Sequence, residues 1–324
     1  MVPGTSSTLG LHPSRATGIT RIMLRTPSKH VIQTIICLIL VYLSWGSSFI
    51  GIKFGLTSFP PFLLIGIRML LAGIILFTLI WMRGERNIPT LQDFRHTFVL
   101  AIYMVFIASG FLAKGQETVS SGTAAMILGT TPIWMVLGGW LIWKEKRPTP
   151  IQFAGLGGGF FGLVLLSVNQ GISGESSLLG ILLVLSAPLA WVVGSFYSKK
   201  HARETRLSVI QNSSLLMAVG GIQCLAASIA LGEVTDFHVT DVTGIGAAAL
   251  IYLIFSGGII AYTCYFWLLL HTRTEVAISY EYVNPVIGVF LGWLLADEQV
   301  DIVVILACLL TVSSVFFIVS GHRR

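Results

Sequence analysis

The sequence predicts an all-α membrane protein whose ten transmembrane helices form two inverted five-helix repeats. Three observations predict it: the apolar composition, a motif that occurs twice, and an uneven distribution of basic residues. Of the 324 residues, 54% are hydrophobic and 10% are charged, and the mean hydropathy is +0.85. This leaves too little polar surface to cover a soluble globule of this length. The chain is therefore expected to lie in a lipid bilayer.

Ten apolar stretches are long enough to be membrane spans, because a helix of about 20 apolar residues crosses about 30 Å of hydrocarbon. They are residues 30–56, 61–82, 97–114, 123–143, 151–168, 179–197, 208–231, 244–270, 276–296 and 302–320. Ten spans divide into two sets of five. We therefore expect a first repeat over residues 30–168 and a second over residues 179–320.

A motif with the pattern P-x6-G-W-L-x3-E supports this duplication, because proline, tryptophan and glutamate are scarce in an apolar chain. The first copy contains Pro132, Gly139, Trp140, Leu141 and Glu145, and the second contains Pro285, Gly292, Trp293, Leu294 and Glu298. The copies lie on the fourth and ninth spans, so an odd number of crossings separates them. The second repeat should therefore be inverted, as in many secondary transporters.

The basic residues predict the orientation. If the amino terminus is cytoplasmic, all but three of the 20 Lys and Arg residues lie on the cytoplasmic side. These are Arg15, Arg21, Arg25, Lys29, Arg83, Arg86, Arg95, Lys144, Lys146, Arg147, Lys199, Lys200, Arg203, Arg206, Arg273, Arg323 and Arg324. Such an excess follows the positive-inside rule and predicts that both termini are cytoplasmic. It also explains the net charge of +6 by topology and by attraction to anionic lipid headgroups, so no nucleic-acid partner is expected.

Residues 1–29 contain Ser, Thr, Pro, Gly and Arg but no Asp or Glu. They show no apolar periodicity, so we expect a disordered cytoplasmic tail. The same composition also fits a transit peptide, or a translation start at Met23 instead of Met1.

Several segments resemble a known family. Those on the first four spans are Trp45-Gly46-Ser47-Ser48-Phe49, Arg68-Met69-Leu70-Leu71-Ala72-Gly73, and Ser121-Gly122-Thr123-Ala124-Ala125 running into Thr131-Pro132. They look like the signatures of EamA-type carriers in the drug/metabolite transporter superfamily. On the ninth span, Ser279-Tyr280 followed by Tyr282-Val283-Asn284-Pro285-Val286-Ile287 is similar to the bacterial inner-membrane exporter branch. The resemblance implies a multi-pass inner-membrane protein with two inverted five-helix repeats, a central cavity and alternating access, and it favours export. Glu281 departs from the pattern, since many relatives have a small residue there.

Charged residues within spans are the first candidates for a substrate pathway, because each is costly in hydrocarbon unless it is paired or hydrated. Arg68 lies about 10 Å from the outer boundary, and Glu281 lies about 8 Å from the inner one. About 12 Å of a 30 Å core then separates them, so they are not expected to neutralise each other. Arg68 either anchors a substrate carboxylate or a gate, or snorkels and ties helices together. Glu281 either responds to protons or binds an amine, or it pairs with Arg273.

The remaining pathway candidates are aromatic or hydrogen-bonding residues within the spans: Trp45, Ser47, Ser48, Thr131, Trp191, Tyr197, Tyr280 and Asn284. Tryptophan and tyrosine offer an apolar face with one polar tip, although ordinary helix packing also explains them. Pro132 and Pro285 each remove a backbone donor and suggest one kink per repeat. The kinks act either as hinges or as static bends.

Two glycine pairs on one span, Gly155 with Gly159 and Gly158 with Gly162, form a small-residue face. Such a face can pack within the chain or in a homodimer, and packing within the chain is favoured because these faces are common inside bundles. Both a monomer and a homodimer remain expected states.

No enzyme, cofactor or metal site is predicted. The cysteines lie within spans without C-x-x-C spacing, the histidines lie in loops, tails or span ends, and no catalytic set or H-E-x-x-H motif is present. The absence of a phosphate-binding G-x-x-x-x-G-K-[ST] loop leaves an ion gradient as the driving force. We therefore expect a secondary transporter of small metabolites, amino acids or drugs, with protons as a candidate coupling ion. A passive channel and an intramembrane enzyme are the alternatives.

Overall fold

The computed structural model describes residues 29–85, 87–119, 124, 127–170, 177–296 and 302–320. These residues form helices and loops without any strand, so the all-α prediction is confirmed for them. The predicted tail, most of the Ser121–Ala125 motif and Glu298 lie outside the described residues.

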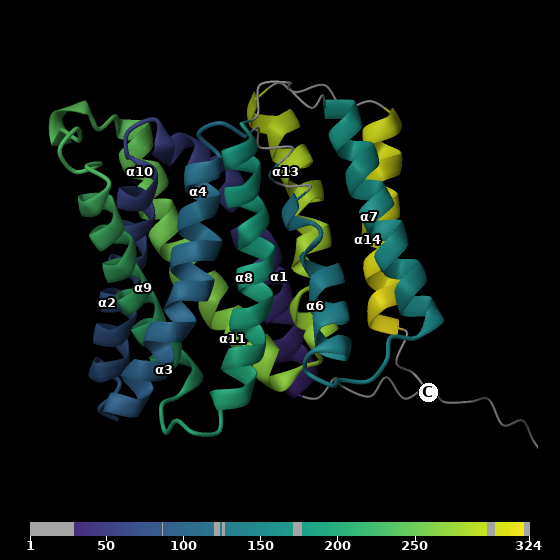
Figure 1. Cartoon of the computed structure of the whole chain (residues 1–324), viewed down its shortest axis with the longest axis horizontal. Coiled ribbons are helices and arrows are strands. Elements are labelled where there is room, and N and C mark those ends of the chain that lie inside the picture. The colour runs from purple at the N-terminus through teal and green to yellow at the C-terminus, as the bar shows by residue number, and fades with distance from the viewer. Residues whose placement is uncertain are drawn as a thin grey trace, which may run out of the picture.

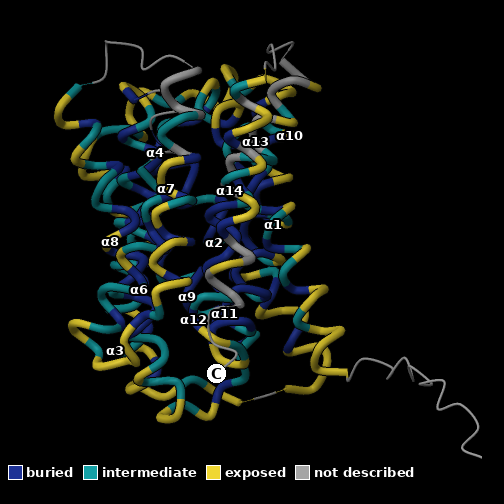
Figure 2. Tube along the Cα trace, turned by 90° about the vertical axis from the view of Figure 1, so that its right-hand side faces the viewer, coloured by how far each residue is buried: buried dark blue, intermediate teal, exposed yellow. Residues whose placement is uncertain are grey.

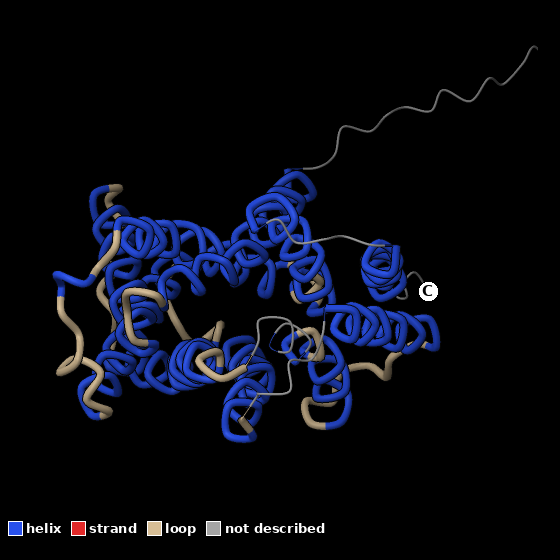
Figure 3. Tube along the Cα trace, turned by 90° about the horizontal axis from the view of Figure 1, so that it is seen from above, coloured by secondary structure: helices blue, strands red, loops and turns tan. Residues whose placement is uncertain are grey.

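Within the described part of the chain, ten helical rods stand side by side in one bundle (Figure 1). They are α1 (Lys29–Leu56), α2 (Pro61–Met82), α3–η1–α4 (Leu91–Ala101, Ile102–Phe111 and Leu112–Gly115), α6 (Thr131–Leu141), α7 (Pro150–Gln170), α8 (Leu178–His201), α9 (Val209–Ala230), α10–η3–α11 (Gly244–Tyr252, Leu253–Ile260 and Ala261–His271), α13 (Tyr280–Ala296) and α14 (Ile302–Ser320). The short helices η2 (Val239–Asp241) and α12 (Thr274–Ala277) lie in connections. Figure 3 shows the same bundle along the rods, with the C-terminal helix at its edge.

Six of the described rods are long and apolar enough to cross a membrane: α1, α2, residues 91–115, α8, α9 and residues 244–271. Their outer surfaces are apolar as well. On α1, for example, Ile35, Ile36, Ile39 and Leu43 are about half exposed, whereas the buried residues gather inside the bundle (Figure 2). An apolar exterior of this kind is suited to contact with lipid chains.

One end of the bundle carries most of the described basic residues, and we call it the basic end. It is the lower end in Figure 1 and contains the start of α1 together with the loops after α2, α6, α8 and α11. The helix α1 runs away from this end, whereas α8 runs toward it and finishes there at His201.

Polar side chains define where several helices begin. Thr90 and Ser208 each form a capping box, with Asp93 at the start of α3 and with Gln211 at the start of α9. Each box satisfies backbone N–H groups that have no partner within the helix. These helix starts therefore lie at the basic end, where the connecting loops are polar.

The helices α2 and α9 form a pair. The loop after each of them carries a glutamate that contacts the start of the other helix. The carboxylate of Glu233, three residues beyond the end of α9, accepts from the Phe62 and Leu63 N–H groups of α2 at 3.4 and 3.1 Å. Glu85, three residues beyond the end of α2, accepts from the hydroxyl of Ser208, the N-cap of α9, at 3.0 Å. A carboxylate is favourable at the positive end of a helix dipole. Each of the two 22-residue helices therefore has at its start a carboxylate from the loop that follows the other.

Glycine lets α2 and α9 approach until their backbones touch. A Cβ atom on Gly73 would lie 2.6 Å from the backbone N of Ala218, and one on Gly221 would lie 2.5 Å from the backbone N of Leu70. The Ser214 hydroxyl donates to the Gly73 carbonyl at 2.9 Å, which adds a hydrogen bond across the same contact. The first and second halves of the chain thus meet along a closely packed helix pair.

The two halves also interlock. The helix α1 packs against α13 and the α10–η3–α11 rod of the second half, whereas α8 packs against α6 and the α3–η1–α4 rod of the first half. Each half thus contributes its first helix to the other half. The space between them is enclosed by helices of both.

One glycine of the predicted small-residue face of α7, Gly159, packs closely within the chain. A Cβ atom on Gly159 would lie 2.5 Å from the Tyr282 ring and 2.7 Å from the hydroxyl of Ser314 on α14. By contrast, a Cβ atom built on Gly157 would meet no atom of another described helix within 4 Å.

The two prolines lie at different places in their helices. A turn at Gly129–Thr130 precedes α6, which places Pro132 in the first turn of that helix, where proline needs no N–H partner. Pro285 instead lies inside α13, which begins at Tyr280 after a turn at Ile278–Ser279. The breaks therefore fall at different distances from the two prolines, and a hinge role for either stays a prediction.

The glycine contact between α2 and α9 predicts opposite effects for two similar substitutions. Gly221→Ala should lower the thermal unfolding temperature, because backbone atoms of Leu70 block its methyl group and overpacking costs about 1–3 kcal/mol. Gly157→Ala is the matched control and should raise the temperature, since alanine is favoured over glycine in a helix by about 0.5–1 kcal/mol. Thermal unfolding in detergent measures both. Equal shifts would show that the two helices do not need this contact.

Candidate functional site

A cavity of about 90 Å³ lies inside the bundle and is lined by helices from both halves. Eight of the ten pathway residues predicted from the sequence line it: Trp45, Ser48, Arg68, Thr131, Trp191, Tyr280, Glu281 and Asn284. The fold thus gathers side chains from α1, α2, α6, α8 and α13 around one space.

Ser47 and Tyr197 do not line this cavity, which corrects their predicted placement. Ser47 points to a different face of α1, where its hydroxyl hydrogen-bonds with the hydroxyl of Tyr252. Successive helix residues are 100° apart, so Ser47 and Ser48 cannot share a face. Tyr197 lies six residues beyond Trp191, or about 9 Å along the helix, and its hydroxyl contacts His96 near the basic end at 2.9 Å.

Aromatic rings form one wall of the cavity. The Trp45 ring lies edge-on to Trp191 at a centroid distance of 5.2 Å and to Tyr262 at 5.6 Å. It also contacts Tyr280 at 4.6 Å. Edge-to-face packing is a favourable arrangement for such rings. The two tryptophans, one from the first helix of each half, therefore meet beside the cavity.

Hydrogen bonds fix the positions of these rings. The indole N–H of Trp45 donates to the Gly257 carbonyl at 3.3 Å, and that of Trp191 donates to the Tyr265 hydroxyl at 3.0 Å. The same hydroxyl is 2.7 Å from the Ser195 hydroxyl. Since both indole N–H groups have partners, the wall presents apolar ring surface to a guest.

The helix α2 contributes a charged side chain, Arg68, to the cavity wall. It is 4% exposed, and its Nε and Nη1 atoms have no hydrogen-bond partner among the described residues. No salt bridge to a described carboxylate is present either. An isolated buried charge is costly, so the guanidinium is expected to bind an anion or water through these unused N–H groups.

Glu281 lines the same cavity and is also buried, at 5% exposure. The side chains of Tyr280 and Thr131 are the polar groups that interact with its carboxyl group. In agreement with the spacing predicted from the sequence, it forms no ion pair with Arg68 within the described residues. The two charged groups therefore remain separate features of one cavity.

Asn284 and Thr131 occupy matching positions in the two halves, and both line the cavity. The Thr131 hydroxyl donates to the Leu128 carbonyl in the break before α6. The Asn284 carboxamide oxygen has no hydrogen-bond donor among the described residues. It is therefore a free acceptor for a guest.

Sequence reasoning missed the remaining nine lining residues. They are Phe49, Ile52, Ala108, Ser109, Leu112, Leu128, Ala187, Pro188 and Tyr262. Most are apolar and gave no signal. One signal was available, because Ser109 and Tyr262 are separated by the same number of residues as Pro132 and Pro285 of the duplicated motif. Their hydroxyls lie 3.2 Å apart. Comparing the third spans of the two halves at this offset would have identified the pair.

Two π-helices lie beside the cavity. Ala108 and Ser109 of η1 line it, and Gly257 of η3 leaves room for neighbouring polar atoms. A Cβ atom on Gly257 would lie 2.8 Å from the Ser48 hydroxyl and 3.6 Å from Arg68 Nη2. Wide turns of this kind are frequent at functional sites.

Comparison with known proteins gives a consistent result. The sequence model of the EamA-like transporter family matches residues 32–168 and again residues 178–320. The inner membrane transporter YedA of Escherichia coli strain K12 is 28% identical over 283 residues, which cover 87% of this chain and 89% of YedA. The probable amino-acid metabolite efflux pump of the same strain is 27% identical over 294 residues, with 88% and 94% covered.

One solved structure, described only as "Crystal structure of protein", supports the fold. It aligns with a TM-score of 0.72 at 18% sequence identity, covering 92% of this chain and 100% of the other. At this identity the likeness concerns the arrangement of helices.

The unpaired guanidinium predicts that Arg68→Met does not destabilise the protein. The thermal unfolding temperature should stay the same or rise, because methionine fills similar space without a buried charge. Arg83→Met, which alters an exposed arginine, serves as the control and should have no effect. A decrease of several degrees for Arg68→Met alone would reveal a stabilising partner for the guanidinium.

Proposed function

Because the chain belongs to the EamA-like transporter family, whose model matches both of its halves, we propose that it exports small metabolites of the amino-acid type by alternating access. The family and the relatives make it a multi-pass inner-membrane transporter and not an enzyme. The finer parts of the proposal are substrate class, direction and mechanism, and each rests on separate features.

The observation that carries the substrate class is the buried, unpaired Arg68 beside an aromatic wall. A guanidinium binds a carboxylate through two parallel hydrogen bonds, while the Trp45 and Trp191 rings offer apolar surface. The free oxygen of Asn284 and the carboxyl group of Glu281 suit an amine. A molecule with a carboxylate, an amine and an apolar side chain would satisfy all of these groups.

The size of the cavity favours small substrates over drugs. Drug-sized ligands usually occupy pockets of about 300–1,000 Å³, whereas this cavity has about 90 Å³. A relative named as an amino-acid metabolite efflux pump is consistent with this class. Larger guests would require the surrounding helices to separate.

Alternating access rests on the proposal that the two halves are inverted repeats with the cavity between them. The opposite directions of α1 and α8, the carboxylates at the starts of α2 and α9, and the exchange of first helices all fit such a repeat. In this arrangement an outward-open and an inward-open state can be equivalent by symmetry.

Polar contacts hold helix ends together at the basic end. Lys199 at the end of α8 forms an ion pair with Glu145 at 3.3 Å and hydrogen-bonds with Thr274. Deeper in the bundle, the hydroxyl of Tyr42 in the middle of α1 lies 2.6 Å from the hydroxyl of Ser279, just before α13. We infer that this end faces the cytoplasm, as the excess of basic residues predicts, and that these contacts must separate for substrate to enter during export.

The transport proposal is tested with labelled amino acids in proteoliposomes. Arg68→Gln should reduce uptake of the transported amino acid at least about tenfold, because a hydrogen bond to a charged group contributes about 1.5–3 kcal/mol. It should not reduce transport of the corresponding amide, which lacks the carboxylate. Ser47→Ala, which lies outside the cavity, is the control and should transport normally. Equal losses for acid and amide would remove Arg68 as the carboxylate site.

A proton-coupled mechanism makes a separate prediction for Glu281. Glu281→Gln should abolish the dependence of transport on a proton gradient and leave the unfolding temperature near that of the wild type, because the amide is isosteric. This dependence is measured as the transport rate at several external pH values while the internal pH is held constant. An unchanged pH profile would show that Glu281 does not couple transport to protons.

A passive channel is the alternative, and counterflow separates the two. A carrier preloaded with unlabelled substrate should accumulate labelled substrate transiently and show saturable rates. An ungated conductance that does neither would identify a channel.

A further inference from the structure

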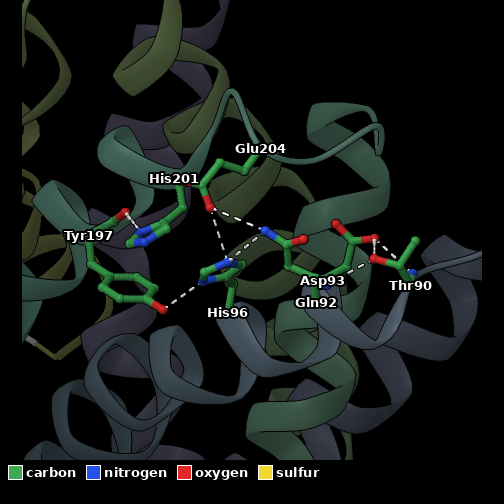
Figure 4. Close-up of polar contacts among 7 residues, drawn as sticks. All are labelled: Thr90, Gln92, Asp93, His96, Tyr197, His201 and Glu204. Carbon is green, nitrogen blue, oxygen red and sulfur yellow. Dashed lines mark hydrogen bonds and ion pairs between the residues drawn. The ribbon is translucent and has the colours of Figure 1, made fainter.

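We propose that His96, His201 and Glu204 form a zinc site that joins the two halves of the chain at the basic end. One ligand atom from each side chain lies within 4.8 Å of the others. No metal site is predicted from the sequence alone, where the histidines lie in loops, tails or at span ends. The fold brings them together by placing the start of α3 beside the end of α8 (Figure 4).

The donor set suits zinc. Two imidazoles and one carboxylate, with water as the fourth ligand, are a usual ligand set for Zn²⁺, whereas Mg²⁺ and Ca²⁺ prefer oxygen ligands alone. Ligands that lie 2.0–2.1 Å from a tetrahedral metal are about 3.4 Å apart. The Nε2 of His96 and Oε2 of Glu204 are already 3.2 Å apart. The ion would therefore draw in His201 by on the order of 1 Å.

The imidazole of His201 is held in the tautomer that a metal requires. Its Nδ1 atom lies 3.0 Å from the backbone carbonyl of Tyr197. A carbonyl only accepts, so this nitrogen must be the protonated one. The lone pair is then on Nε2, and a backbone partner of this kind is typical of histidine ligands.

Tyr197 also supports His96. Its hydroxyl lies 2.9 Å from His96 Nδ1 and can either donate or accept. Without metal, His96 donates from Nε2 to Glu204. With metal, the imidazole proton of His96 would be on Nδ1, which donates a hydrogen bond to the tyrosine hydroxyl. Nε2 is then free to act as a ligand. Tyr197 thus serves both histidines, one through its hydroxyl and one through its carbonyl.

Gln92 contacts two of the proposed ligand atoms and must turn its carboxamide away from His96 when an ion binds, because its Nε2 lies 3.5 Å from His96 Nε2. Gln92 donates to Glu204 Oε2 at 3.4 Å and so orients the carboxylate. Asp93 instead caps α3, accepting from the N–H and the hydroxyl of Thr90 at 2.8 and 2.6 Å. A cavity of about 60 Å³ adjoins His96 and His201, which leaves room for a water ligand.

The location gives the ion a structural consequence. His96 belongs to the first half of the chain, whereas His201 and Glu204 belong to the second. A bound ion would therefore hold α3 and α8 together, and it would stabilise any state in which these helix ends are close.

The test is zinc binding to the full-length, tag-free protein by isothermal titration calorimetry. The wild type should bind one Zn²⁺ per chain at this site and unfold at a higher temperature with Zn²⁺ than with a chelator. His96→Gln, His201→Gln and Glu204→Gln should each weaken binding at least about tenfold and reduce the thermal shift. Glu204 is 44% exposed, so its isosteric variant tests the site without a large risk to folding.

His271→Gln is the matched control. It removes a histidine from another helix end, where it stacks on Trp267, and should bind zinc like the wild type. Co²⁺ provides a second readout, because its absorption distinguishes nitrogen and oxygen ligands from thiolates such as those of Cys37 and Cys264, which contact each other. Wild-type affinity in Glu204→Gln and His201→Gln, or a thiolate spectrum, would overturn the proposal.

Discussion

The close contact between α2 and α9 is the constraint on which the rest of the structure depends. Their backbones meet at Gly73 and Gly221, where any side chain would collide with main-chain atoms. In a bilayer, helices gain little from hiding apolar surface, because lipid is equally apolar, so close packing must supply the attraction. This pair sets the distance between the two halves. The cavity, the interlocked helices and the contacts at the basic end are built around it.

The sequence predicted the features that depend on composition and order along the chain. Hydrophobic stretches located the rods, the repeated motif divided the chain, and buried polar residues pointed to the cavity. Arg68 and Glu281 were identified because charge within a span needs an explanation. Tyr262 was missed because a tyrosine in a span has ordinary packing uses, and only its relation to Ser109 through the repeat distinguishes it.

Other features depend on helix phase or on contacts between distant segments. Ser47 and Ser48 are neighbours with the same side chain, yet only Ser48 lines the cavity, because the rotation of α1 is fixed by packing. Pro132 was expected inside a continuous span, but the helix begins beside it. The cluster of His96, His201 and Glu204 arises from two helix ends more than one hundred residues apart in the sequence. No local pattern contains that information.

The π-helices η1 and η3 indicate how the two halves of the chain arose. Each adds backbone to a turn and weakens its hydrogen bonding, so such a segment persists mainly where it has a use. Both occur in the third rod of their half, and both supply residues beside the cavity. Independent origin would require the same costly irregularity to arise twice at corresponding positions. It is simpler that a five-helix ancestor already possessed the wide turn, and that gene duplication copied it together with the half-site it serves.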